Sequence, residues 1–351
     1  MIHSSDTTAD LQNGIDASGS NTWLLRAFGW AIVLSVFVYV INNYLNVWWE
    51  WPGAMPFYGL IGLADGARNV PTDGAGITKT VAQFLAYAVV AVLAFVACLK
   101  TSNRALRTDA NILSGITNYI IRAAFWAVLL IGLADAFISY LRVEGMLSTF
   151  VGDTMTTELG RSRFRGPYVH FPLIIASLII AAKVKDLGFH WLGLLIVAAE
   201  LLIVVTRFVF SYEQAYQGDL VRFWYGALFL FASAYTLFDD GHVRVDVFYS
   251  GFPERLKGMV NAGGALFMGI ALCWTILIFG MWDKSSIINA PLANYEVSQS
   301  GFGMYVKFWM AGFLGIFAVT MAVQFVSLMF EGLADWRGDP GKREVSQAGA
   351  H

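Results

Sequence analysis

The chain has 351 residues, of which 57% are hydrophobic and only 14% are charged, and its mean hydropathy is +0.59. A soluble domain usually carries about a quarter charged residues, so this composition excludes a purely soluble protein. The formal net charge of -2 provides no bulk attraction for nucleic acid, and we expect no nucleic-acid partner. Cys98 and Cys273 lie in apolar runs, where a thiol usually packs as a small hydrophobic group.

The first 22 residues form a polar tail that we expect in the cytoplasm. They carry Asp6, Asp10 and Asp16 and lack the basic, apolar and small-residue regions of a cleavable secretory signal. We therefore expect the first apolar helix to direct membrane insertion.

Eight stretches are long and apolar enough to cross a bilayer, because a helix needs about 20 mostly apolar residues to span roughly 30 Å of hydrocarbon. The sequence predicts an all-α, polytopic membrane protein. The fourth stretch is short and ends at Lys183 and Lys185. A half-span or a tilted, protein-buried helix is therefore an alternative to a full span there. The stretches are 24–45, 81–99, 120–141, 168–182, 188–209, 221–238, 259–281 and 308–330.

The distribution of Lys and Arg sets the expected orientation. If all eight stretches cross, more than half of the 23 basic residues fall on the side of the N-terminus, which predicts that both termini are cytoplasmic. The remainder include Arg161, Arg163 and Arg165, which we place in the longest outer loop. The tail at 336–351 is polar, and we expect a short disordered cytoplasmic end.

Aromatic residues gather where two of the expected spans end. The residues Trp48, Trp49 and Trp51 follow the first span. Because amphipathic rings prefer the headgroup level, we expect these residues to anchor the chain at the outer membrane interface. The anchor could be a helix that lies flat on the membrane. Segment 211–222 is too polar to span and too aromatic for a simple linker. We expect it to lie along the outer interface as well.

Two acidic residues fall inside expected spans. An ionisable group at membrane depth is costly and by default faces protein or water, which marks Asp135 and Glu200 as buried ionisable candidates. One interpretation is a proton or cation site. The interpretation that we favour is a carboxylate that hydrogen-bonds a neighbouring helix or a partner subunit.

The histidines do not favour a haem-bearing anchor. Two histidines that ligate one haem must face each other at the same depth, whereas His170 begins the fourth span from outside and His190 begins the fifth from inside. The sequence also lacks a phosphate-binding loop, a dinucleotide fingerprint and zinc-ligand spacing. We therefore expect no enzyme, no cofactor and no metal site.

One loop between two spans has a distinctive sequence. It contains Gly241, His242, Val243, Arg244, Val245 and Asp246, followed by Pro253, Glu254 and Arg255. This loop resembles the signature loop of the small, Q-type membrane subunit of tripartite ATP-independent periplasmic (TRAP) transporters. The run from Arg207 to Phe210 resembles the Arg-Tyr-x-Phe pattern that closes the first helix of that family.

Two positions depart from the family pattern. Members usually carry an acidic pair before their second helix, where this chain has Gln217-Gly218-Asp219. They often enter the last helix through Pro-Trp, where this chain has Lys307-Phe308-Trp309. The resemblance covers 186–335, which leaves 23–185 as an N-terminal extension of about four membrane helices.

The resemblance implies a scaffold in the bacterial cytoplasmic membrane. A periplasmic substrate-binding protein would capture an organic acid, a large membrane subunit would move it with sodium ions, and this non-catalytic subunit would brace the large one within the lipid bilayer. The alternative is a stand-alone secondary transporter or channel that uses Asp135 and Glu200. A redox or enzyme anchor is a third and weaker hypothesis. Transporters with midplane sites often have interrupted helices in symmetric positions, and these spans contain no such pair, which favours the scaffold.

Overall fold

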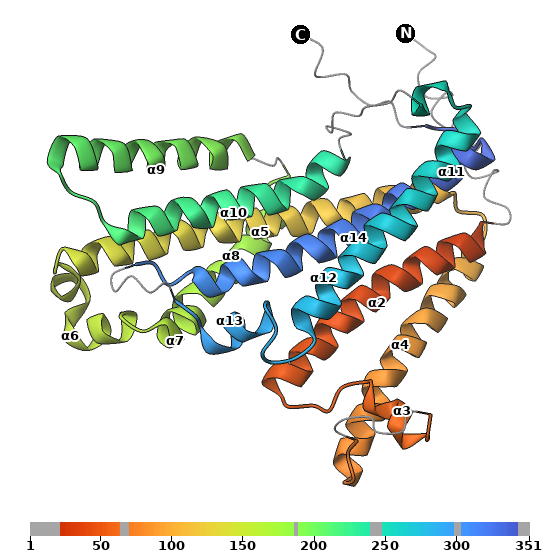
Figure 1. The fold of residues 1–351 in the computed structure, drawn as a ribbon, viewed down its shortest axis with the longest axis horizontal. Coiled ribbons are helices and arrows are strands. Elements are labelled where there is room, and N and C mark those ends of the chain that lie inside the picture. Colours follow the sequence, from red (N-terminus) through yellow and green to blue (C-terminus); the bar gives the residue numbers. More distant parts are fainter. Residues whose placement is uncertain (1–21, 64–69, 186–188, 239–247, 298–302, 343–351) are drawn as a thin grey trace. The chain divides into compact units, whose positions relative to one another are not determined.

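The computed structural model describes residues 22–63, 70–185, 189–238, 248–297 and 303–342 (Figure 1). The described part is helical, with two π-helical segments, η1 and η3, and one short 3-10 segment, η2. The expected signature loop at 241–246 and most of both tails lie outside the described residues. In chain order the elements are α2 (Trp23–Trp48), α3 (Pro56–Leu60), α4 (Gly74–Lys100), α5 (Leu106–Val143), α6 (Leu147–Leu159), α7 (Ser162–Arg165), η1 (Gly166–His170), α8 (Phe171–Lys183), α9 (Phe189–Phe210), α10 (Ala215–Phe238), η2 (Tyr249–Gly251), α11 (Glu254–Gly264), η3 (Ala265–Ile270), α12 (Ala271–Met281), α13 (Asn289–Asn294) and α14 (Lys307–Arg337).

Eight helical runs within the described residues are long and apolar enough to cross a membrane. Each overlaps one of the expected stretches, so the predicted all-helical, polytopic class is confirmed. The fourth run is longer than expected: α7, η1 and α8 join into 22 residues from Ser162 to Lys183. Helices dominate because a backbone in hydrocarbon must satisfy its own N–H and C=O groups.

The helices extend past their apolar stretches. Helix α5 has 38 residues, about 57 Å at 1.5 Å per residue, so its ends reach beyond roughly 30 Å of hydrocarbon. Helix α10 begins at Ala215, and its first two turns include the polar part of segment 211–222. Most of that segment is therefore the polar start of a membrane helix, and only 211–214 precede it.

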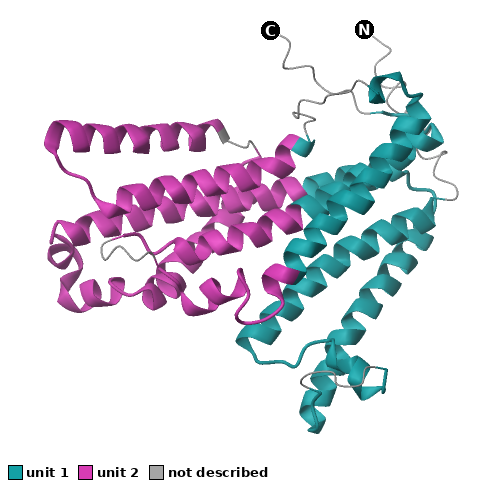
Figure 2. Ribbon diagram, viewed as in Figure 1, with its two compact units in different colours: residues 1–116, 237–278, 321–351 teal, residues 117–236, 279–320 magenta. Residues whose placement is uncertain are grey.

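The chain forms two compact units, which Figure 2 colours separately. Unit 1 comprises 1–116, 237–278 and 321–351, and unit 2 comprises 117–236 and 279–320. Helices α5 and α14 contribute one part to each unit. Each unit thus combines helices of the N-terminal extension with helices of the region that resembles the TRAP subunit.

Unit 2 has a core of aromatic contacts between α5, α10 and α14. The ring of Phe313 packs against Phe223 and Phe231, with ring centroids 5.2 and 5.1 Å apart. The indole of Trp224 lies on Gly132 of α5 and donates to the carbonyl of Val128 at 3.3 Å. A Cβ at Gly132 would lie 2.3 Å from the indole nitrogen, so only glycine allows this approach.

Unit 1 packs α2 against α4 on one side and against the C-terminal half of α14 on the other. Phe330 is fully buried beside Gly29, where a Cβ would meet the phenyl ring at 2.3 Å. The surrounding apolar cluster joins α2, α5, α11, η3 and α14. Its buried members are Val33, Leu106, Ala110, Leu113, Ala262, Ala265, Ile270, Val323, Val326, Met329, Phe330 and Ala334.

Buried charges also hold unit 1 together. Arg26 of α2 is 1% exposed and donates to the Asp109 carboxylate at 2.7 Å, and its other nitrogens bind Thr101. Trp30 donates to the same carboxylate oxygen at 2.9 Å. Arg107, at the start of α5, binds Glu331 and Asp335 of α14. These contacts fasten α2 and α14 to the first turns of α5.

Helices α11 and α14 touch through their backbones. A Cβ at Gly258 would lie 2.5 Å from the Trp336 nitrogen and 2.6 Å from the Gly332 oxygen. A Cβ at Gly332 would lie 2.7 Å from the Gly258 oxygen. Small residues allow such approaches, and between membrane helices van der Waals packing replaces the hydrophobic effect as a driving force.

Ala at Gly332 should therefore destabilise unit 1. The new methyl group must push two backbones apart, and overpacking of this kind costs about 1–3 kcal/mol. We expect Gly332→Ala to lower the thermal unfolding temperature of the purified protein in detergent. Gly263→Ala is the matched control, because nothing lies within 4 Å of a Cβ at that position of α11. Equal stability of the two variants would contradict the close crossing.

Candidate functional site

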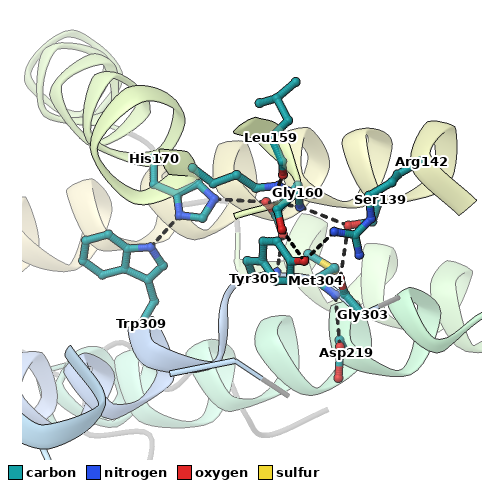
Figure 3. A network of polar contacts seen from close by, with 12 residues as sticks. Ser139, Arg142, Leu159, Gly160, His170, Asp219, Gly303, Met304, Tyr305 and Trp309 are labelled. Carbon is teal, nitrogen blue, oxygen red and sulfur yellow. Dashed lines mark hydrogen bonds and ion pairs between the residues drawn. The ribbon is translucent and has the colours of Figure 1, made fainter. Parts of the chain in front are cut away.

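A polar face of α5 forms the centre of a buried network in unit 2. Asp135, Ser139 and Arg142 follow one another at spacings of four and three residues, which places them on the same side of the helix. Asp135 and Ser139 are both 0% exposed. The network around them includes residues from α7, η1, α10, α14 and the segment that leads into α14 (Figure 3).

The Asp135 carboxylate accepts hydrogen bonds on both oxygens. Arg165 Nη1 lies 2.8 Å and His170 Nε2 lies 3.1 Å from Oδ1. The backbone N–H of Tyr305 donates to Oδ2 at 2.6 Å. Arg165 is also 0% exposed, so the ion pair is fully removed from solvent. Each charge compensates the other, as burial of an ion requires.

The hydrogen bonds around His170 identify its tautomer. Trp309 Nε1 lies 2.9 Å from His170 Nδ1, and an indole N–H can only donate. Nδ1 must therefore carry the lone pair, and Nε2 carries the proton that it donates to Asp135. The imidazole is neutral in this arrangement, and both ring nitrogens are engaged.

Tyr305 lies between two arginines. The guanidinium carbons of Arg165 and Arg142 lie 4.4 and 4.9 Å from the ring centroid, within the range of a cation–π contact. The Tyr305 hydroxyl accepts from Arg142 Nη1 at 2.5 Å and donates to the Gly160 carbonyl at 2.8 Å. These contacts fix the segment before α14 against α5 and the α6–α7 connection.

Asp219 of α10 extends the network to a further helix. Its Oδ2 accepts from the backbone N–H of Met304 at 3.1 Å, and its side chain is 8% exposed. This aspartate belongs to the Gln217-Gly218-Asp219 run that departs from the acidic pair of the resembled family. Two neighbouring backbone N–H groups, those of Met304 and Tyr305, are thus bound by aspartates from two different helices.

The hydrogen bonds of the network favour a structural role over the transfer of ions or protons. Three of the roughly four carboxylate lone pairs of Asp135 already accept from Arg165, His170 and Tyr305, which disfavours a cation ligand at this position. A proton on the carboxylate would remove the charge that compensates the buried guanidinium. The arrangement is suited to joining four helical segments and the entry to α14.

Sequence reasoning identified Asp135 but missed its partners. Arg165 was expected in an outer loop, yet it is fully buried at the end of α7. The sequence gives no sign that His170 binds Asp135, and it does not mark Tyr305 at all. One signal was available, because the expected spans place Arg165 on the same outer side as the end of α5 that carries Asp135. An unpaired carboxylate there needs a cation.

Glu200 differs from the expectation of a buried group. It is exposed on α9, which lies at the edge of unit 2 beside α10 (Figure 1). Only 11% of the most apolar stretch of this helix is buried, the lowest share among the eight described spans. Within the described residues the Glu200 side chain has no hydrogen bond or ion pair.

The two residues of the helix-end pattern lie at the C-terminal end of α9. Arg207 is 65% exposed and lies 3.8 Å from Glu213. Phe210 is 68% exposed. Beyond them, Tyr212 donates to Glu144 after the end of α5, and this hydrogen bond raises the pKa of Tyr212 to about 12. This hydrogen bond ties the α9–α10 connection to the end of α5.

The tryptophans lie where the first span ends, and their role as an interfacial anchor stays a prediction. Trp48 is the last residue of α2 and stacks on Tyr44 at 5.3 Å, and Trp49 is 62% exposed. Trp51 is half-buried, and Lys79 lies 5.6 Å from its ring centroid. The segment is a loop, and a short helix, α3, follows only at Pro56.

Loss of either partner of the Asp135–Arg165 pair should be strongly destabilising. Asp135→Asn leaves a buried guanidinium and Arg165→Gln a buried carboxylate, and each loss costs about 3–5 kcal/mol. We expect the double variant to lose less stability than the sum of the two, because neither charge remains. Thermal unfolding in detergent measures all three.

Arg161→Gln provides the control for this experiment. Arg161 pairs with Glu158 at 2.9 Å in the same connection, but it is 62% exposed, and a surface pair contributes less than about 1 kcal/mol. Two results would contradict the buried ion pair. One is a loss of stability in the double variant equal to the sum of the two single losses, and the other is a loss of stability in Arg161→Gln as large as that in Arg165→Gln.

Comparison with known proteins gives one match. Residues 196–335, from within α9 to two residues before the end of α14, match the family model of tripartite ATP-independent periplasmic transporters, DctQ component. No curated protein and no solved structure matches the chain. The matched range begins ten residues after the expected start of the resembling region, and other membrane helices precede it. Residues 196–335 of this multi-pass inner-membrane protein thus match the DctQ family model, which describes the small permease subunits of TRAP transporters.

Proposed function

We propose that this chain is a non-catalytic scaffold subunit of a TRAP-type secondary transporter. In this proposal a large membrane subunit moves an organic acid together with sodium ions, and a periplasmic binding protein delivers the acid. The family match at 196–335 is the observation that carries the proposal. The partners, the coupling ion and the substrate class follow from what the resemblance implies.

The packing within each unit supports a scaffold, because each unit combines helices of the extension with helices of the family region. Helix α14 belongs to the matched region, and 72% of its most apolar stretch is buried, the largest share among the described spans. Within unit 1 it contacts α2 and the start of α5, and within unit 2 it donates to His170 through Trp309. The extension therefore contacts the last helix of the family region within each unit.

The outer face of α9 supports a docking role. Glu200 is exposed near the middle of this helix, among exposed apolar residues such as Val197 and Leu201. A carboxylate left in lipid costs several kcal/mol, so it requires a donor from another molecule. The exposed stretch of α4 from Val81 to Leu99 contains no charged residue and suits lipid contact. We assign α9 as the helix that meets the large subunit.

A stand-alone transporter receives less support. That hypothesis needs Asp135 and Glu200 to handle ions, whereas Asp135 is bonded on both oxygens and Glu200 lies on an exposed face. Within the described residues the two side chains share no contact. They do not form one ion site in this fold.

Reconstitution in liposomes tests the proposed function. The chain alone, under an inward sodium gradient, should not accumulate any member of a panel of radiolabelled mono- and dicarboxylates. The chain together with the large subunit and the binding protein should accumulate one of them. Sodium-driven uptake by the chain alone would overturn the scaffold and favour the stand-alone transporter.

Substitutions at Glu200 separate docking from ion handling. Glu200→Gln keeps the shape and most hydrogen bonding, so the complex should assemble and transport should survive. Glu200→Leu removes the acceptor and should reduce copurification with the large subunit, because the donor on the partner is left buried and unpaired. Glu213→Gln, an acid just beyond the same helix, should change neither. Loss of transport in an assembled Glu200→Gln complex would assign ion handling to Glu200.

A further inference from the structure

A cavity of about 640 Å³ opens in unit 2 where α10 and α14 begin. Its walls come from α10, α14, α13 and the segment before α13. The volume lies within the roughly 300–1,000 Å³ of typical ligand sites. Asp219 also accepts from Met304 in the polar network described above, and the other lining residues have no role in that network.

The cavity changes from charged to apolar along the membrane helices. Asp219 and Arg222 lie in the first turns of α10, and Lys307 is the first residue of α14. Met310 and Leu314 line the same cavity three and seven residues further along, which is roughly 5–10 Å deeper at 1.5 Å per residue. Because two membrane helices begin here, the charged rim lies at headgroup level and the apolar wall faces the hydrocarbon.

The rim carries two cations and two anions. Lys307 Nζ lies 2.5 Å from Glu296 Oε1, and both side chains are nearly half exposed. Arg222 Nη1 lies 3.7 Å from Asp219 Oδ1, which is beyond hydrogen-bond distance, and Arg222 is 75% exposed. The Arg222 guanidinium thus keeps its donors for a further acceptor, and a planar guanidinium matches a phosphate in geometry.

We propose that this cavity binds a phospholipid with a zwitterionic headgroup that ends in a primary ammonium. The phosphate binds Arg222, the ammonium binds Glu296, and an acyl chain lies along Met310, Ala311 and Leu314. A net-neutral rim fits a net-neutral headgroup, since a surplus negative charge would meet two carboxylates. Inorganic phosphate could use only the rim, whereas the apolar wall needs a chain to cover it. The site requires no partner subunit and goes beyond the scaffold function.

Lipid retention by the purified chain tests this site. The delipidated full-length protein is titrated in detergent with phosphatidylethanolamine or with phosphatidylglycerol of the same acyl chains, and native mass spectrometry counts the adducts. We expect tighter binding of phosphatidylethanolamine. Arg222→Gln should weaken it about tenfold, as expected when one charge-assisted contact is lost. Ala311→Phe should weaken it by filling the apolar part while leaving the charges intact.

Arg207→Gln is the matched control. Arg207 is also an exposed arginine at the end of a membrane helix, with a carboxylate at 3.8 Å, but it does not line the cavity. We expect it to retain the lipid as the unchanged chain does. Any one of three results would overturn the proposal. The first is equal lipid retention by all three variants, and the second is equal or tighter binding of phosphatidylglycerol. The third is displacement of the lipid by millimolar inorganic phosphate. Thermal unfolding of each variant identifies a general loss of fold.

Discussion

The ion pair between Asp135 and Arg165 is the constraint on which unit 2 depends. Taking one charged side chain out of water costs several kcal/mol, so neither charge can be buried without the other. The pair alone would leave lone pairs unfilled, and His170 and the Tyr305 N–H fill them. Formation of the site therefore requires α5, α7, η1 and the entry to α14 to be in place together.

The same principle holds unit 1 together by different means. Arg26 and Asp109 form a buried pair near the start of α2, and Arg107 binds two carboxylates of α14. Between these polar contacts the helices approach through Gly29, Gly258 and Gly332. Lipid tails are as apolar as leucine, so apolar area alone gives little preference for one helix pairing over another. Buried ion pairs and close glycine contacts supply the specificity.

The sequence could predict the spans because their signal is local. Twenty apolar residues in a row mark a helix regardless of its neighbours, and each of the eight expected stretches overlaps an observed one. Helix ends were predicted less well: α10 begins six residues before the expected 221, because polar residues such as Gln217 and Asp219 continue a helix beyond the hydrocarbon. Hydropathy alone cannot distinguish a polar helix start from a polar loop.

The site was only half predictable for a physical reason. The cost of a charge in a membrane identified Asp135 from its position alone, but the identity of its partners is a property of the tertiary fold. Arg165 and Tyr305 are 30 and 170 residues away from it in sequence. The same cost argument applied to Glu200 predicts a partner that this chain does not supply among its described residues. The cost of a charge in the membrane thus accounts for the buried ion pair of Asp135 and for the proposed docking role of the exposed Glu200.

The entry to α14 joins the region that resembles the TRAP subunit to the extension. Trp309 occupies the entry to α14, where the family pattern has Pro-Trp, and it donates to His170 of the extension. Here the residues before α14 present two successive N–H groups, from Met304 and Tyr305, to Asp219 and Asp135. The extension therefore supplies, through Asp135 and His170, the partners that fix the start of the last family helix.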